Sequence, residues 1–294
     1  MRGPDEGGFK LVKLMRVLAA AAVLSFMGAG AAQAAGSLNP GSGNLGFTMM
    51  VGYNASYIDY KETAEYRGAI DRDYGYLNGI DAEIRFESGL VWTRFAADYS
   101  WTHNSTYDGA LWDGTPVKAS NHERINLYEG DIGFKALNVK TSTLTPYVGI
   151  GYRLWHRGMD EPPNYIEKYS WYFAAIGINY VWRIDRSTFG LDVAAHIPFD
   201  MKLATNFAGQ APEFSGNLKK RVGFEVRLPF TYDFCRNRAN SRRAFLFLTP
   251  YYQYWAIGAS EPVTINLAGT PTPVMEPDSR TDIYGADAGA GVNF

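Results

Sequence analysis

The sequence predicts an all-β fold, namely a closed antiparallel transmembrane β-barrel of about ten strands with short turns at one end and longer loops at the other. Apolar and polar residues alternate with period two through much of the 294-residue chain, as in strands with one apolar and one polar face. Aromatic residues make up 15% of the chain, glycine occurs 31 times, and mean hydropathy is only -0.22. This mixture is typical of a wall between lipid and a polar interior.

Composition excludes several other classes of protein. After residue 35 no apolar run approaches the roughly 18 residues of a transmembrane helix, so a helical membrane protein is excluded. The single cysteine excludes an intrachain disulfide framework and a zinc site made of clustered cysteines. The formal net charge of -2 carries no signature of nucleic-acid binding, and no nucleic-acid partner is expected.

Residues 1–35 are predicted to be a signal peptide that is removed. Lys10, Lys13 and Arg16 precede an apolar stretch over residues 17–27, and Ala32-Gln33-Ala34 forms an A-x-A cleavage site. Translation from Met15 would give a cleaner leader, so Met15 is a possible true start. Residues 36–294 are then the barrel domain.

Ten strands follow from the alternation, and the last one is the clearest. Every second residue from Tyr284 to Phe294 is apolar, while those between are Gly, Asp or Asn. The strands are long compared with the usual 5–6 residues, and a tilted transmembrane strand needs roughly 9–11 residues in hydrocarbon. They are predicted at residues 44–60, 74–87, 90–103, 121–136, 143–157, 166–183, 188–203, 217–232, 244–258 and 280–294.

The connections between these strands alternate in length. Short ones lie near residues 87–89, 137–142, 184–187 and 233–243, and long ones near 61–73, 104–120, 158–165, 204–216 and 259–279. Short periplasmic turns alternating with longer external loops are typical of an outer-membrane barrel, and an even strand number places both ends of the barrel in the periplasm. Four prolines in residues 259–279 predict an extended, mobile last loop.

A sheet that spans a lipid bilayer is expected to close into a barrel. Lipid offers no partner for an unpaired sheet edge, so a membrane-spanning sheet must close on itself. A secreted β-sandwich is the soluble alternative, and it predicts shorter strands. Aromatic residues at strand ends predict two interfacial girdles: Tyr57, Tyr74, Tyr99, Trp101, Tyr169, Tyr172, Tyr254 and Tyr284 externally, and Phe47, Phe86, Phe134, Tyr180, Trp182, Phe189, Tyr232 and Phe294 at the periplasmic end.

The terminal strand also carries a family resemblance. The run Tyr284-x-Ala286-x-Ala288-x-Ala290-x-Val292-x-Phe294 resembles the C-terminal strand signal of Gram-negative outer-membrane β-barrels. That resemblance implies a location in the bacterial outer membrane, with outer-membrane lipid and lipopolysaccharide as neighbours. It also implies that the barrel assembly machinery reads Tyr284, Val292 and Phe294. No external ligand is indicated.

Ten strands enclose a narrow lumen that side chains can largely fill. Counting from the periplasmic ends places Arg94 level with Glu83 and Asp131, and Asp192 level with Arg227. The predicted luminal charge network is Asp81, Glu83, Arg85, Arg94, Asp98, Glu129, Asp131, Arg153, Asp192, His196, Arg227 and Asp287. Paired charges and inward aromatics (Trp92, Trp171, Phe173, Phe247, Tyr251 and Trp255) predict a salt-bridged, largely plugged lumen and a structural or surface-interaction role. The alternative is a narrow channel for ions or small polar solutes, with these charges at its constriction.

An outer-membrane hydrolase is the second alternative, although no catalytic residue is assigned. Ten strands and the Asp71-Arg72-Asp73 spacing resemble the omptin surface proteases, but the Asp-x-His pair of that family occurs nowhere in this chain. His196 and Asp192 share a face but are expected deep in the lumen. No cofactor and no metal site are predicted, since His122-Glu123 is an isolated pair.

A lipid A deacylase is the other hydrolase considered. His103-Asn104-Ser105 matches the H-x-S motif of these enzymes. Parity places the His103 and Ser105 side chains outward, toward lipid, where that chemistry would need them.

Overall fold

The structure is a computed structural model that describes residues 46–64, 68–110, 115–159, 165–206, 214–236, 243–267 and 270–294. These residues belong to one compact unit, Asn44–Phe294. The predicted signal peptide, residues 1–35, and the possible start at Met15 lie outside the described residues. In the part of the chain that the structure describes, no helix has the length and apolarity needed to cross a membrane.

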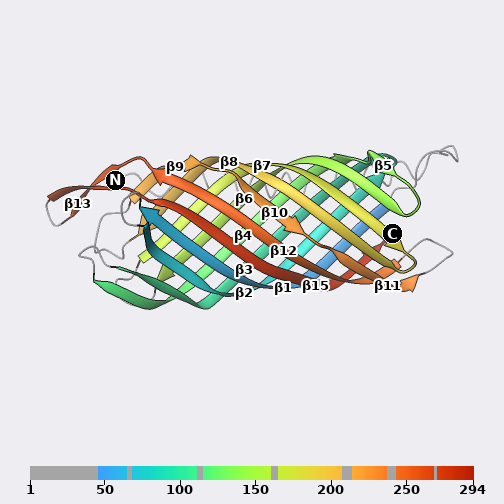
Figure 1. Ribbon diagram of the computed structural model, residues 1–294, viewed down its shortest axis with the longest axis horizontal. Coiled ribbons are helices and arrows are strands. Elements are labelled where there is room, and N and C mark those ends of the chain that lie inside the picture. The colour runs from blue at the N-terminus through green and yellow to red at the C-terminus, as the bar shows by residue number, and fades with distance from the viewer. Residues whose placement is uncertain are drawn as a thin grey trace. The chain divides into compact units, whose positions relative to one another are not determined.

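Ten strand positions form a tilted ring of antiparallel strands in the described residues (Figure 1). Nine are continuous apart from local bulges: β1 (Gly46–Ala64), β2 (Gly68–Ser88), β3 (Val91–Ala110), β4 (Pro116–Phe134), β6 (Ser142–Met159), β7 (Tyr165–Ile184), β8 (Ser187–Asn206), β12 (Arg243–Ser260) and β15 (Asp278–Asn293). The remaining position is filled in sequence by β9 (Phe214–Lys220), β10 (Gly223–Arg227) and β11 (Phe230–Arg236), each paired with both β8 and β12.

The ring closes through the last strand. β15 pairs antiparallel with β1 on one side, where Thr48 lies opposite Asn293, and with β12 on the other. The predicted fold class, an all-β closed antiparallel barrel of about ten strands, is therefore confirmed. Closure leaves no sheet edge at this seam, as a lipid environment requires.

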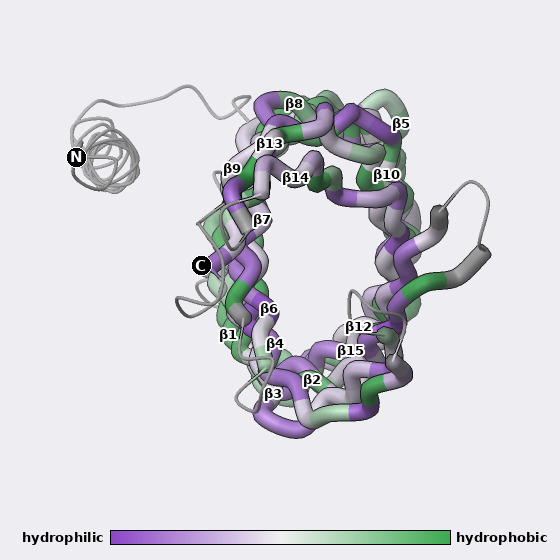
Figure 2. The backbone as a smooth tube through the Cα atoms, turned by 90° about the vertical axis from the view of Figure 1, so that its left-hand side faces the viewer, coloured by the Kyte–Doolittle hydropathy of each residue, from purple (hydrophilic) through white to green (hydrophobic). Residues whose placement is uncertain are grey.

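The outer face carries an apolar band along one part of every strand. On β3, for example, Val91, Phe95 and Tyr99 point outward and are 41–47% exposed, whereas the inward Trp92 and Arg94 are 4% exposed. Figure 2, which looks along the barrel, shows apolar and polar residues alternating around the wall. A band that alternates with a polar interior is the exterior of a membrane-spanning barrel.

An aromatic row marks the external boundary of this band. Tyr128, Tyr152, Tyr172 and Phe199 are successive cross-strand partners on β4, β6, β7 and β8. Tyr152 and Tyr172 have ring centroids 5.0 Å apart, and Tyr172 and Phe199 5.9 Å. The girdle prediction was wrong for Tyr169, which shares the inward parity of Trp171 and is completely buried.

The strands continue beyond the band at the external end, where the sequence predicted loops. β3 runs to Ala110 and β4 begins at Pro116, so most of the expected loop 104–120 is strand. The last external loop contains a hairpin, β13 (Val263–Leu267) with β14 (Thr270–Val274), in place of the predicted extended loop. Ile265 of this hairpin is 5% exposed and joins the apolar core with Leu218.

The periplasmic end has tight connections. Gly89 turns β2 into β3 with a φ of +56°, a conformation that glycine adopts without strain. A two-residue strand, β5 (Leu137–Asn138), pairs with the start of β6. The ninth strand is interrupted at Pro229, whose ring nitrogen has no hydrogen to donate to a neighbour, so the single strand predicted at 217–232 is wrong.

Candidate functional site

The first candidate site is a charged layer inside the membrane-spanning part of the barrel, here called the mid-lumen layer. Arg94 on β3 forms ion pairs with Glu129 and Asp131 on β4 at 2.8 and 2.7 Å, and with Asp192 on β8 at 3.4 Å. All four side chains are at most 6% exposed. Because β8 lies four strands away around the ring, Arg94 bridges the lumen.

A second arginine completes this layer. Arg227 on β10 lies 2.7 Å from Asp287 of β15 and 3.5 Å from Glu225. Asn54 donates a hydrogen bond to Asp287 at 2.6 Å. The mid-lumen layer thus consists of two guanidinium groups, each shared between carboxylates from different strands, which ties strands together across the interior.

The structure confirms some of the predicted alignments of luminal charges and contradicts another. Arg94 and Asp131 lie directly opposite in the β3–β4 register, as counting predicts. Glu83 instead lies opposite Ala96, and its ion-pair partner is Arg85. Arg227 and Asp192 are opposite in register, yet their side chains take other partners. Asp192 accepts hydrogen bonds from Tyr147 and Asn179 as well as Arg94.

The remaining predicted network residues also lie inside the barrel. Asp81 is 8% exposed, and Asp98 accepts a hydrogen bond from Ser100 at 2.8 Å. His196 and Arg153 are completely buried. Among the described residues, Arg153 Nε and Nη2 have no hydrogen-bond partner, whereas its Nη1 donates to Gln253 at 3.2 Å.

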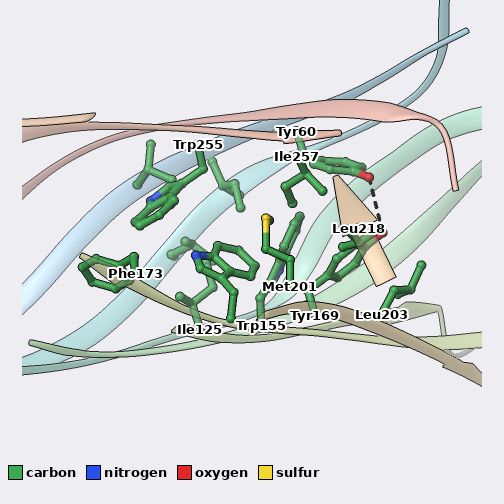
Figure 3. Close-up of a cluster of buried hydrophobic side chains, with 14 of the residues drawn as sticks. Tyr60, Ile125, Trp155, Tyr169, Phe173, Met201, Leu203, Leu218, Trp255 and Ile257 are labelled. Atoms are coloured by element: carbon green, nitrogen blue, oxygen red, sulfur yellow. Dashed lines mark hydrogen bonds between the residues drawn. The ribbon is translucent and has the colours of Figure 1, made fainter. Parts of the chain in front are cut away.

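An aromatic layer lies directly external to these charges. Trp155, Trp171, Phe173 and Trp255 are 0–1% exposed and come from β6, β7 and β12. Figure 3 shows Trp155, Phe173 and Trp255 in this layer. Arg153 lies over the Trp171 and Trp255 rings, with its guanidinium carbon 5.4 and 5.1 Å from their centroids. A Cβ on Gly151 would collide with the Phe173 ring, so glycine at this position makes room for the layer.

The second charged site, here called the outer acid cluster, lies inside the strand extensions beyond the membrane band. Its centre is Arg157, which pairs with Glu62, Asp73 and Glu167 at 3.0, 2.9 and 3.3 Å. Further carboxyl groups of the cluster are bound by neutral donors: Glu123 accepts from Trp155 Nε1 at 2.5 Å, and Glu276 lies 2.5 Å from Tyr169 OH.

Burial makes these carboxyl groups retain protons. Desolvation raises the pKa of Asp73 to about 6 and that of Glu167 to about 7, although Arg157 favours their ionised forms. Desolvation and neighbouring acids also raise the pKa of Glu123 and of Glu276 well above the ordinary value. The outer acid cluster therefore exchanges protons over a pH range in which ordinary carboxyl groups are fully ionised.

The last external loop covers this cluster. Glu276 lies two residues after the end of β14 and is 7% exposed, and its backbone N–H donates to Ser260 Oγ at 2.9 Å. Tyr60 and Tyr169, whose hydroxyl oxygens are 3.4 Å apart, lie beneath it (Figure 3). The hydrogen bond between Glu276 and Ser260 closes the base of this loop, and Ile265 of the β13–β14 hairpin packs in the same apolar cluster as Tyr60 and Tyr169.

The hydrolase candidates lie in settings that parity did not predict. A bulge between Thr102 and Ser105 shifts the register of β3 against β4. Ser105 is consequently 1% exposed, not outward, and donates to the Asn121 carbonyl at 2.8 Å, while His103 is exposed. The prediction that both side chains face lipid was therefore wrong. Asp73 of the Asp-x-Asp pair is buried against Arg157.

The proposed assembly-signal residues lie on the outside of the terminal strand. Tyr284, Val292 and Phe294 are 53%, 37% and 49% exposed. Phe294 exchanges backbone hydrogen bonds with Phe47, which fixes the chain end to β1.

Sequence reasoning missed the outer acid cluster as a unit. Its carboxyl groups come from four strands and a loop, in segments that were assigned to loops or strand ends. The inward parity of Glu123 and Arg157 could have placed those two in the interior, because the β4–β6 pairing continues without a bulge through both residues.

No family model and no curated sequence matches this chain. Among solved structures, it is similar to the outer membrane protease OmpT from Escherichia coli, with a TM-score of 0.54 and 12% identity over 88% of this chain and 98% of that one. OprG from Pseudomonas aeruginosa aligns at a TM-score of 0.40 and 13% identity over 86% and 98%. At such identities the likeness concerns the fold alone, which is that of Gram-negative outer-membrane β-barrels.

Proposed function

We propose that this outer-membrane β-barrel protein fills its lumen with its own side chains and serves a structural or surface-interaction role. The observation that carries the proposal is the aromatic layer, in which Trp155, Trp171 and Trp255 are completely or almost completely buried together with Arg153. Side chains of this size fill the interior of a narrow barrel and leave little room for water or ions.

Two further features support a filled lumen. Internal to the aromatic layer, Arg94 joins carboxylates of β4 and β8 across the barrel, and the cavity beside it has a volume of about 50 Å³. External to it, the β13–β14 hairpin lies over the outer acid cluster. A permeating ion would have to displace groups at all three levels.

Planar bilayer recording tests this proposal. The purified barrel should give no stable conductance steps, whereas the double variant Trp171→Ala and Trp255→Ala should conduct, because it removes two rings from the aromatic layer. A matched control is Trp182→Ala, an outward residue that is 49% exposed. Stable conductance of the unmodified protein would overturn the proposal and favour a narrow channel for ions or small polar solutes.

The outer wall offers an interaction surface for lipopolysaccharide. Arg124, His156 and Lys168 are cross-strand neighbours on β4, β6 and β7, four residues external to the aromatic row at Tyr128, Tyr152 and Tyr172. Arg124 and Lys168 are exposed, and burial together with these two cations lowers the pKa of His156. A basic row just above an interfacial girdle is at the height of lipid headgroup phosphates.

Binding of lipopolysaccharide to the refolded barrel tests this surface. The double variant Arg124→Ser and Lys168→Ser should bind more weakly by about thirtyfold, because each cation contributes roughly 1 kcal/mol near an anionic surface. Lys140→Ser, an exposed lysine at the periplasmic end, is the control and should leave binding unchanged. Equal binding by both variants would contradict the role of this row.

A further inference from the structure

Three potential metal ligands meet inside the barrel from three different strands. They are Glu129 on β4, His196 on β8 and Glu225 on β10, and one donor atom from each lies within 4.8 Å of the others. All three residues are at most 7% exposed. Glu129 reaches the other two from across the lumen, whereas β8 and β10 are paired neighbours.

The imidazole of His196 is the unusual member of this group. Its side chain is completely buried, and among the described residues neither ring nitrogen has a hydrogen-bond partner. Nε2 points to Glu129, whose Oε2 is 3.8 Å away, too far for a hydrogen bond. A buried polar group without a partner is destabilising, so the site contains a donor atom that a bound ligand would satisfy.

Aromatic rings fix the orientation of this imidazole. The ring of Trp255 stacks on His196 at a centroid distance of 4.9 Å and an angle of 16°, and Phe173 lies 4.7 Å away. These contacts hold the ring without using its nitrogen atoms. A histidine held by stacking alone remains available to coordinate a metal.

The local charge favours a cation despite the nearby arginines. The adjoining cavity of about 50 Å³ is lined by six acidic residues (Asp81, Glu83, Asp98, Glu129, Glu225 and Asp287) but only two basic ones, Arg94 and Arg227. Arg94 has Asp131 and Asp192 as further partners, and Arg227 has Asp287. Each guanidinium group can therefore keep a carboxylate when Glu129 and Glu225 turn toward a metal.

A route of small cavities leads to this place from the periplasmic end. A cavity of about 150 Å³ lies at that end, and it shares Met50, Arg85 and Pro229 with a middle cavity of about 20 Å³. The middle cavity shares Asp81, Glu83, Arg94 and Arg227 with the inner one. Cavities of these volumes hold one to several waters, and the inner cavity brings such water beside Glu129 and Glu225.

We propose that Glu129, His196 and Glu225 form a binding site for a divalent cation of the zinc class at the inner end of this periplasmic route. One imidazole and two carboxylates match the nitrogen and oxygen ligands that Zn²⁺ accepts, and cavity water supplies a fourth ligand. Bonds of about 2.1 Å place tetrahedral ligand atoms about 3.4 Å apart, so donor atoms that lie within 4.8 Å of one another must close by at most about 1.4 Å. The site is independent of whether the lumen conducts.

Metal titration of the refolded, untagged barrel tests the proposal. Isothermal titration calorimetry with Zn²⁺ should give one site per chain, and Co²⁺ should give visible d–d bands of a four-coordinate site. His196→Phe keeps the stacking with Trp255 and removes the ligand, and Glu225→Gln removes a carboxylate. Each variant should weaken binding at least tenfold, whereas the exposed control His103→Phe should bind as the unmodified protein does.

Gel mobility before and after heating shows whether each variant is folded, and only folded variants are compared. If His196→Phe does not fold, Glu225→Gln alone carries the test. Absence of a stoichiometric site in the unmodified barrel would overturn the proposal. A site that folded His196→Phe or Glu225→Gln retains at full affinity would overturn it equally.

Discussion

The mid-lumen layer and the outer acid cluster both hold buried acids, but they neutralise them differently. In the mid-lumen layer two arginines are shared among carboxylates at 2.7–3.5 Å. In the described part of the outer acid cluster, Arg157 alone faces Glu62, Asp73 and Glu167. Protons neutralise the remaining charge there, as the raised pKa values indicate.

This difference has a physical consequence for the two ends of the lumen. A guanidinium group stays charged over the whole accessible pH range, whereas a buried carboxyl group loses its proton as pH rises. Interactions in the mid-lumen layer that rest on Arg94 should therefore resist changes of pH. The outer acid cluster should loosen when its carboxyl groups ionise together, and the covering hairpin should loosen with it.

The largest expected effect is the loss of the central arginine. Arg94→Ala leaves Glu129, Asp131 and Asp192 without their shared partner, and removal of one partner of a buried ion pair costs about 3–5 kcal/mol. Urea unfolding in phospholipid vesicles measures this cost. Arg72→Ala, which breaks a pair on a side chain 44% exposed, is the control and should cost at most about 1 kcal/mol. Equal stability of Arg94→Ala and the unmodified barrel would refute the network.

Arg157→Ala should instead give a loss that depends strongly on pH. At pH 8 the variant must either bury ionised carboxylates without a cation or protonate them against the solution, and either costs about 3 kcal/mol. At pH 5 the carboxyl groups of Asp73 and Glu167 are protonated and need the cation less, so the cost should fall by at least half. Hydrogen exchange of the external ends of β1, β2 and β6 measures the cost of Arg157→Ala at pH 5 and at pH 8. A cost that is the same at both pH values would remove the distinction between the two layers.

The stability of the unmodified barrel should also depend on pH, but less strongly than that of Arg157→Ala. Because the folded-state pKa values of Asp73 and Glu167 are raised above their unfolded values, the folded state binds more protons. Their stabilising contribution is complete below about pH 4 and is lost as pH rises through about 6–7, and each of the two pKa changes corresponds to roughly 3 kcal/mol. Proteolysis of the external loops should accordingly be faster at pH 8 than at pH 5. Glu167→Gln should reduce this difference. A proteolysis rate of the unmodified barrel that is independent of pH would contradict the protonation of these carboxyl groups.

The sequence predicts some of this arrangement and not the rest. Period two assigns the inward face, and counting from the periplasmic strand ends gives Arg94 opposite Asp131, because the alternation is unbroken between those ends and the two residues. It fails at Ser105, since a bulge adds a residue that parity cannot count.

Contacts across the lumen cannot be predicted from the alternation of apolar and polar residues along the strands. The meeting of Arg94 with Asp192, and of Glu129 with His196, depends on the tilt and stagger of the closed ring. Neither the tilt nor the stagger is written in the alternation of one strand. The order of the acid residues along the chain likewise gives no sign of the outer acid cluster, whose members come from β1, β2, β4, β6 and β7 and from the last loop.

A pair of matched tyrosine variants gives the smallest and sharpest test of the comparison. Tyr147 OH donates to Asp192 at 2.6 Å in the mid-lumen layer, and Tyr169 OH lies 2.5 Å from Glu276 in the outer acid cluster. Each Tyr→Phe change removes one hydroxyl beside a buried carboxyl group, at a cost of about 1–2 kcal/mol.

The two variants should differ in how this cost changes with pH. Tyr147→Phe should cost about the same at pH 5 and pH 8, because Arg94 remains beside Asp192 at both. Tyr169→Phe should cost more at pH 8, because the hydroxyl also lies 3.0 Å from Glu167 Oε2 and favours the ionised form of Glu167, whose pKa is about 7. Urea unfolding follows the first variant and hydrogen exchange of the β7 and β15 ends the second. If both costs change equally with pH, the two layers do not differ in how their carboxyl groups are neutralised.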